Sequence, residues 1–222
     1  MKYEILKDEF IELDGRKLYQ IKALKDFRDV KEGEFGGYIE SERNLSHKGN
    51  AWVSGNARVS GNARVSGNAR VSGNARVSGN ARVSGSARVC GNAQVSGSAW
   101  VSGNARVSGN ARVSGSARVC DNARVSGSAR VCDNAQVSGS ARVLSRHSVV
   151  WFSNVGTENG TLTVYCGKNG LIATRGCFTG SVEEFLAKSA KVHDEKNKRE
   201  YELLIEVARS RLGEAQGNIE DE

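Results

Sequence analysis

One six-residue phrase, A-R-V-S-G-N, repeats almost without error between Ala51 and Val143. The Ala and Val positions return every six residues with no insertion or deletion, and the Val positions continue to Val149. A repeat this regular indicates a solenoid, in which each unit buries its apolar side chains only against its neighbours. Because no extra residues interrupt the repeat, we expect no active-site loop to project from the middle of the chain.

The order of residues within the unit predicts a short strand followed by a corner. Ala and Val stand two residues apart, so on extended backbone they face one side while Arg and Ser face the other. The Gly-Asn pair predicts a sharp bend, because Gly reaches positive φ without steric cost and Asn tolerates it well. We therefore expect Val and Ala inside a coil and Arg outside. The chain contains no proline, which suits continuous ladders of hydrogen bonds.

The order V-S-G-N-A-R resembles the hexapeptide of left-handed parallel β-helix proteins, in which an aliphatic residue is followed four positions later by a small one. The resemblance implies three hexapeptides per triangular turn, with residues eighteen apart stacked at about 4.8 Å, the spacing of paired strands. We predict an all-β solenoid, a left-handed parallel β-helix of roughly five to six turns. The six-residue period excludes pentapeptide solenoids and nonapeptide calcium rolls, and a right-handed β-helix stays as an alternative.

The segment before the repeat, residues 1–50, predicts a small β cap. Tyr3 to Leu13 and Lys17 to Leu24 flank an Asp14-Gly15 turn and predict a hairpin. Two degenerate hexads follow, with Ile39 and Leu45 in the Ala frame of the repeat. Terminal repeats of solenoids are commonly atypical, so these larger side chains are expected to close the first turn.

Residues 51–149 form the repeat, and residues 150–222 predict an α+β cap. The sequence there predicts a hairpin of Thr161 to Cys166 and Leu171 to Thr174, a helix from a capping box at Ser181 through Lys191, and an amphipathic helix from Lys198 to Leu212. Gly213 ends the last helix, and the polar residues after it are expected to fray.

Positive charge is concentrated on the repeat. Residues 51–143 hold twelve Arg against Asp121 and Asp133, a net charge of +10 in a chain whose total is +7. Stacking by eighteen sorts these Arg residues into three ladders. One is unbroken beneath Trp52, and the others are interrupted by Gln94 or by Trp100 and Gln136. The unbroken ladder, which we expect to attract anions, is Arg70, Arg88, Arg106, Arg124 and Arg142.

The cysteines and histidines predict no metal or cofactor site. Cys90, Cys120 and Cys132 replace the repeat Ser on three different faces, so they can neither pair within the coil nor converge on zinc. Cys166 and Cys177 lie in the second cap with spacing unlike a metal motif. His47 and His147 stand at opposite ends of the repeat, and His193 lies in a polar linker.

The end segments carry a narrower resemblance. Gly36-Gly37-Tyr38-Ile39 with Asn44-Leu45-Ser46, then Asn154-Val155-Gly156 and residues 174–180, resemble those of prophage and bacterial hexapeptide-repeat proteins of the YdcK-like type. That family is generally labelled acyltransferase-like or uncharacterised. The resemblance therefore implies the fold more than an activity, since fold does not settle function.

Three functions are consistent with these features. We favour a non-catalytic interaction protein, a rigid Arg-faced rod that binds protein partners through its caps and through the breaks in its repeat. Trp100, Gln94, Trp151 and Phe178 are the predicted contact residues. One alternative is binding of nucleic acid or another polyanion by the Arg ladders. The other is a hexapeptide-repeat acyltransferase with His147 as the general base.

The remaining expectations concern assembly and location. The apolar residues of the second cap, among them Trp151, Phe152, Phe178 and Phe185, predict either self-association through that cap or a core of its own. The amino end lacks the pattern of a signal peptide, and no run of about eighteen apolar residues spans a membrane. We expect a cytoplasmic protein, in the host cytoplasm if phage-encoded. The resemblance to prophage proteins also suggests an inhibitory or sequestering role.

Overall fold

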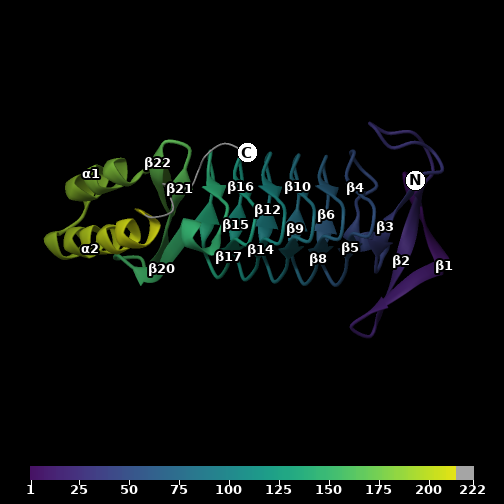
Figure 1. Cartoon of the computed structure of the whole chain (residues 1–222), viewed down its shortest axis with the longest axis horizontal. Helices are drawn as coiled ribbons and strands as arrows, with labels where there is room; N and C mark the ends of the chain where they lie inside the picture. Colours follow the sequence, from purple (N-terminus) through teal and green to yellow (C-terminus); the bar gives the residue numbers. More distant parts are fainter. Residues whose placement is uncertain (214–222) are drawn as a thin grey trace.

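A computed structural model describes residues 1–213 as an elongated molecule with a β-solenoid at its centre and a different cap at each end (Figure 1). The solenoid has three faces, each a parallel sheet that runs along its length. The prediction for the last nine residues lies outside the described part of the chain.

The repeat forms sixteen two-residue strands, one per hexapeptide. They are β4 (Trp52–Val53), β5 (Arg58–Val59), β6 (Arg64–Val65), β7 (Arg70–Val71), β8 (Arg76–Val77), β9 (Arg82–Val83), β10 (Arg88–Val89), β11 (Gln94–Val95), β12 (Trp100–Val101), β13 (Arg106–Val107), β14 (Arg112–Val113), β15 (Arg118–Val119), β16 (Arg124–Val125), β17 (Arg130–Val131), β18 (Gln136–Val137) and β19 (Arg142–Val143). Each pairs in parallel with the strand eighteen residues away, so Val71 lies beside Val89 and Val89 beside Val107. The prediction of three hexapeptides per turn is confirmed. The left hand of the coil stays a prediction.

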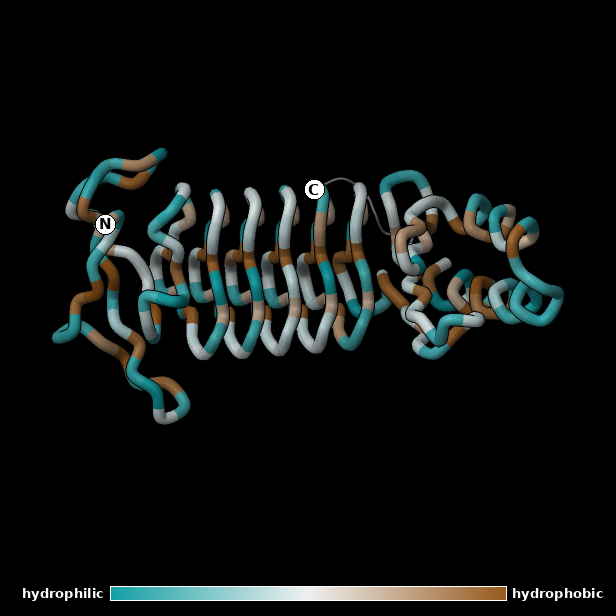
Figure 2. The backbone as a smooth tube through the Cα atoms, turned by 180° about the vertical axis from the view of Figure 1, so that it is seen from behind, coloured by the Kyte–Doolittle hydropathy of each residue, from teal (hydrophilic) through white to brown (hydrophobic). Residues whose placement is uncertain are grey.

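The interior of the coil is as predicted. Every Ala and Val of the repeat from Ala51 to Val143 is at most 1% exposed. Figure 2 shows these apolar positions aligned from one turn to the next, with polar segments between them. Methyl and isopropyl groups thus fill a narrow core by stacking on their own copies.

The corners explain why Gly recurs. In the middle of the coil the corner Gly has positive φ, and a Cβ on Gly97 would lie 2.8 Å from the carbonyl oxygen of Gly115, one turn along. Asp takes this place at positive φ at two corners near the carboxyl end, Asp121 and Asp133. Their carboxylates accept hydrogen bonds from the Gly139 N–H and from Trp151 Nε1, each at 3.1 Å.

The amino-terminal cap continues one face of the solenoid. The predicted hairpin is confirmed as β1 (Tyr3–Leu13) and β2 (Arg16–Ala23), paired antiparallel. The next strand, β3 (Phe35–Ile39), pairs antiparallel with β2 and parallel with β5. A single turn of 3-10 helix, η1 (Glu42–Asn44), follows it.

The placement of Ile39 and Leu45 in the Ala frame is wrong. Ile39 pairs with Val59 and Leu45 with Val65, both twenty residues on, so the two side chains take Val positions. The pairing returns to eighteen at Trp52, which lies beside Arg70. The two extra residues fall in the corner between Ser46 and Gly49. There the corner widens and holds His47 stacked on the Tyr3 ring, with ring centroids 4.2 Å apart.

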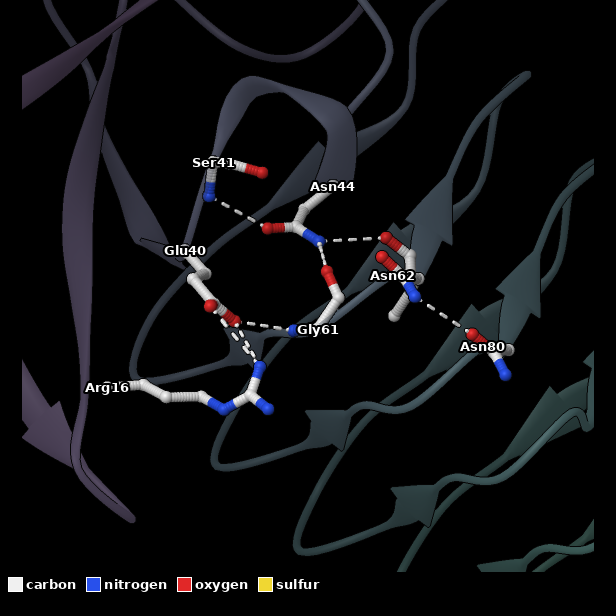
Figure 3. Close-up of polar contacts among 8 residues, drawn as sticks. Arg16, Glu40, Ser41, Asn44, Gly61, Asn62 and Asn80 are labelled. Atoms are coloured by element: carbon white, nitrogen blue, oxygen red, sulfur yellow. Dashed lines mark hydrogen bonds and ion pairs between the residues drawn. The ribbon is translucent and has the colours of Figure 1, made fainter.

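Side chains close the open end of the first turn. The buried Asn44 amide donates to the carbonyl oxygens of Gly61 and Ala63, both at 2.9 Å, while its oxygen accepts from the Ser41 N–H (Figure 3). The Glu40 carboxylate accepts from the Gly61 N–H at 2.6 Å and pairs with Arg16. These contacts give hydrogen-bond partners to backbone N–H and C=O groups that an uncovered strand edge would leave unpaired.

The carboxyl-terminal cap is a four-stranded antiparallel sheet with two helices beyond it (Figure 1). Its elements are η2 (Arg146–Ser148), β20 (Val149–Val155), β21 (Gly160–Gly167), β22 (Gly170–Arg175), β23 (Phe178–Ser181), α1 (Val182–Val192) and α2 (Glu195–Leu212). The predicted hairpin is β21 with β22, and the predicted capping box at Ser181 opens α1. The second helix begins three residues before the predicted start, because the Asp194 side chain accepts from the Asn197 N–H as an N-cap.

This cap closes the other end of the coil with hydroxyl groups. Thr163 Oγ1 accepts from the Gln136 N–H at 3.0 Å, and Thr174 Oγ1 donates to the Gln136 carbonyl oxygen at 2.7 Å. The buried Tyr165 hydroxyl lies 3.2 Å from both the N–H and the carbonyl oxygen of Ser138. Both ends of the solenoid are therefore sealed by side chains of the caps.

Candidate functional surfaces

The Arg side chains form the ladders that the sequence predicts. Each Arg of the unbroken ladder pairs at Cα with the next, from Arg70 through Arg88, Arg106 and Arg124 to Arg142. Arg88, Arg106 and Arg124 are exposed, and Arg70 and Arg142 are half-buried. Among the described residues, one Arg of the repeat makes a salt bridge: Arg70, with Asp29 of the amino-terminal cap.

Like charges crowd the start of this ladder. Burial first, and then the like charges of Arg28 and Arg88, hold the pKa of the Arg70 guanidinium below its usual range. The rest of the ladder faces solvent, where water and salt screen the repulsion between neighbours. The coil thus presents a dense field of cations with few acidic groups to neutralise it.

Trp100 breaks this pattern in the middle of the coil. It lies in register between Arg82 and Arg118, is 41% exposed, and its indole Nε1–H donates to Ser84 Oγ at 3.2 Å. The Arg118 guanidinium carbon lies 5.9 Å from the centre of the indole ring. Within described residues 51–143, no other large apolar side chain is exposed.

The other predicted contact residues lie elsewhere. Gln94 is half-buried on the neighbouring face, between Arg76 and Arg112, so it does not share a face with Trp100. Trp151 is half-buried at the joint between coil and cap, where its indole N–H donates to Asp133. Phe178 is half-buried in the carboxyl-terminal cap, its ring centroid 5.4 Å from that of Phe185. These four residues do not form one patch.

Most apolar residues of the carboxyl-terminal cap form a core of their own. Phe185, Tyr201, Ile205 and Ala208 are buried, with Phe152 and Phe178 packed against them. Trp52, at the start of the unbroken Arg ladder, is also buried, between Tyr3 and Phe27 of the amino-terminal cap. Within residues 51–143, Trp100 is therefore the one exposed aromatic side chain.

The histidines lie far apart along the molecule. His47 stacks on Tyr3 in the amino-terminal cap and its Nδ1 accepts from the Lys2 N–H. His147 is exposed on η2 at the other end of the coil. His193, expected in a polar linker, is instead half-buried, its ring centroid 5.4 Å from that of Tyr201.

Two of the three repeat cysteines, Cys120 and Cys132, are half-buried thiols with a raised pKa. Burial, and then the neighbouring Asp121 carboxylate, raise the pKa of the Cys120 thiol to about 11. The same two causes, with Asp133 as the neighbour, raise the pKa of Cys132. Among the described residues, no three His, Cys, Asp or Glu side chains converge in a way that could hold a metal ion.

Sequence reasoning missed a cavity of about 190 Å³ in the carboxyl-terminal cap. Of the residues that line it, only Phe178 was singled out as a contact residue. The others come from the turn after β20, the end of β22 and the turn that follows it, the two helices and the link between them, so no local motif marks them. The described part of the chain contains no helix long and apolar enough to cross a bilayer.

The stacked parallel strands, the regular corners and the sealed ends define a β-solenoid repeat protein. A family model described as YdcK Beta solenoid repeat matches it in six segments, at residues 51–67, 63–77, 75–90, 87–103, 105–119 and 117–133. The coil is thus built of solenoid repeats of the YdcK type, and all six matches lie within it. A comparison with curated proteins finds no match.

Proposed function

We propose that this protein is a non-catalytic interaction protein, a rigid rod that binds an acidic surface of a protein partner with Trp100 as the anchor. The exposure of Trp100, the one large apolar side chain exposed within residues 51–143, is the observation that carries the proposal. Contact at the caps, self-association among them, belongs to the same proposal. A cytoplasmic rod of this kind suits a phage-encoded protein that sequesters or inhibits its partner.

A perfect repeat cannot define a single binding position, because each turn offers the same side chains as the next. The indole of Trp100 supplies one position that differs from all the others. A large aromatic side chain buries much area with little loss of conformational freedom, which is why Trp is frequent among residues that dominate binding. Arg82 and Arg118 on either side add charge that would meet carboxylates of the partner.

The experiment compares two substitutions that each put Arg into the same ladder. Trp100→Arg restores the consensus hexapeptide, so the coil should fold unchanged, and we expect it to lower partner capture from extracts of the native cells at least tenfold. The matched control, Gln136→Arg, adds the same charge to the same face two turns away and should leave capture unchanged. Equal capture by the wild type and Trp100→Arg would refute Trp100 as the anchor.

Polyanion binding is the second candidate, favoured by the exposed ladder residues Arg88, Arg106 and Arg124, which make no salt bridge within residues 1–213. Here the affinity for single-stranded DNA should fall steeply with salt. Replacing these three residues by Gln should reduce the slope of log K against log salt by about two, at roughly 0.7 per phosphate contact. An unchanged slope would remove this candidate.

A further inference from the structure

The cavity of the carboxyl-terminal cap is lined by more hydrogen-bond donors than acceptors. Arg175 and Lys188 bring positive charge to it, against the single carboxylate of Glu158. That carboxylate is 83% exposed and its Oε2 lies 3.7 Å from Arg175 Nη1, too far for a hydrogen bond. The lining therefore has an excess of positive charge beside a partly enclosed space.

Two hydroxyl groups of the lining lack an acceptor. Ser189, on α1, is 4% exposed, and its Oγ has no hydrogen-bond partner among the described residues. The Tyr201 hydroxyl accepts from Arg175 Nε at 3.0 Å, and within the described chain it donates to no acceptor. His193 Nδ1 is likewise buried without a partner. Buried polar groups are normally satisfied, so the two unpartnered atoms beside this cavity, Ser189 Oγ and His193 Nδ1, point to a ligand that supplies their partners.

The rest of the lining is apolar and aromatic. The Phe178 ring lies at the cavity with the Lys188 ammonium 5.3 Å from its centre, and Phe185 and Val192 complete this side. A cavity of 150 Å³ in another protein holds benzene, so about 190 Å³ admits one six-membered ring with a small substituent.

From this geometry we propose that the cavity binds a small aromatic carboxylate. The carboxylate accepts hydrogen bonds from the Lys188 ammonium and from the Ser189 and Tyr201 hydroxyls, and the ring packs on Phe178. This site is separate from Trp100 on the coil, and it needs no covalent step.

Benzoate is the probe, with benzyl alcohol and acetate as its two halves: the ring without the charge, and the charge without the ring. We expect calorimetry to detect benzoate binding and to give affinities at least tenfold weaker for each half. Benzoate should also slow the alkylation of Cys177 by iodoacetamide, because Cys177 lines the same cavity and its side chain is exposed. No benzoate binding at millimolar concentration, or equal binding of benzyl alcohol, would overturn the proposal.

Variants on α1 separate binding from folding. Lys188→Gln should weaken benzoate binding about tenfold, the usual size of a lost charge-assisted hydrogen bond. Lys191→Gln, an exposed change outside the lining of the cavity, is the matched control. Ser189→Ala should weaken binding while leaving the melting temperature unchanged or higher, because it removes a buried hydroxyl without a partner. If Lys191→Gln weakened benzoate binding as much as Lys188→Gln, the effect would come from net charge and not from the cavity. That result would contradict the proposal.

Discussion

At the scale of single residues, the repeat is held by contacts that each position makes with its own copy one turn away. The Asn62 side chain donates to Asn80 at 3.2 Å, Val71 lies beside Val89, and Gly97 stacks on Gly115. The effect of a substitution on stability therefore depends on the atoms that the next turn places beside it. The corner glycines give the sharpest comparison, because they share one backbone conformation in different surroundings.

Gly97→Ala should destabilise the protein more than Gly139→Ala. Both positions have positive φ, 66° and 64°, so both variants incur about 1–2 kcal/mol of backbone strain. A Cβ at Gly97 also meets the Gly115 backbone at 2.8 Å, whereas nothing lies within 4 Å of one at Gly139. We expect overlap to cost Gly97→Ala about 1–3 kcal/mol more, measured by denaturant unfolding. Equal losses would show that the turns separate freely.

Lys2 should make stability depend on pH above neutrality. Its side chain is buried and Nζ donates to the Ala51 carbonyl oxygen at 2.7 Å. Burial, and then the charge of Lys25, lower the pKa of Lys2 to about 8. In the unfolded chain the ordinary value is near 10.4, so between these values the unfolded state binds more protons and stability rises with pH. Between pH 8 and pH 9.5, the free energy of unfolding of the wild type should therefore rise relative to that of Lys2→Met. A constant difference would contradict this.

At the scale of elements, the caps complete a ladder that the repeat alone leaves open. Asn44→Ala removes the two amide hydrogen bonds to Gly61 and Ala63 and leaves a buried carbonyl without a donor. We expect a loss of about 2–4 kcal/mol in the free energy of unfolding. Asn62→Ala is the matched control, since the Asn62 side chain is exposed and, among the described residues, bonds only another exposed Asn (Figure 3). It should change stability by less than about 0.5 kcal/mol. Similar effects of both variants would show that Asn44 does not close the coil.

The sequence predicted the elements better than their junctions. Arg88, Val89 and their copies were placed correctly, because a strict six-residue period leaves one stacking register. The register of Ile39 and Leu45 was wrong, because the two extra residues near His47 lie in a segment too degenerate to align. The burial of Trp52 could not be predicted for a related reason: it depends on Tyr3 and Phe27, and no period relates these residues to Trp52.

The two candidate sites also differ in how well the sequence predicts them. The exposure of Trp100 follows from its place in the Arg frame, which the sequence shows directly. The cavity around Arg175 and Ser189 depends on how α1 and α2 meet the sheet of the cap. That packing follows from long-range contacts among unlike elements, which the spacing of residues along the chain does not reveal.

At the scale of the whole molecule, the central claim is that the break at Trp100, and not the repeat around it, specifies the partner. A solenoid allows a direct test, because whole turns can be removed without changing the register. Deleting residues 61–78 removes one turn of three consensus hexapeptides, and the next hexapeptide has the same sequence as the first one deleted. The shortened coil keeps Trp100 with Arg82 and Arg118 on either side.

The deciding measurement is the dissociation constant of the captured partner for three proteins: the wild type, the variant lacking residues 61–78, and Trp100→Arg. We predict that the deletion changes the constant by less than about threefold, whereas Trp100→Arg raises it at least tenfold, equivalent to about 1.4 kcal/mol. The opposite ranking, with binding lost on removal of one consensus turn and kept without the indole, would show that the Arg field itself is the binding site and would contradict the account.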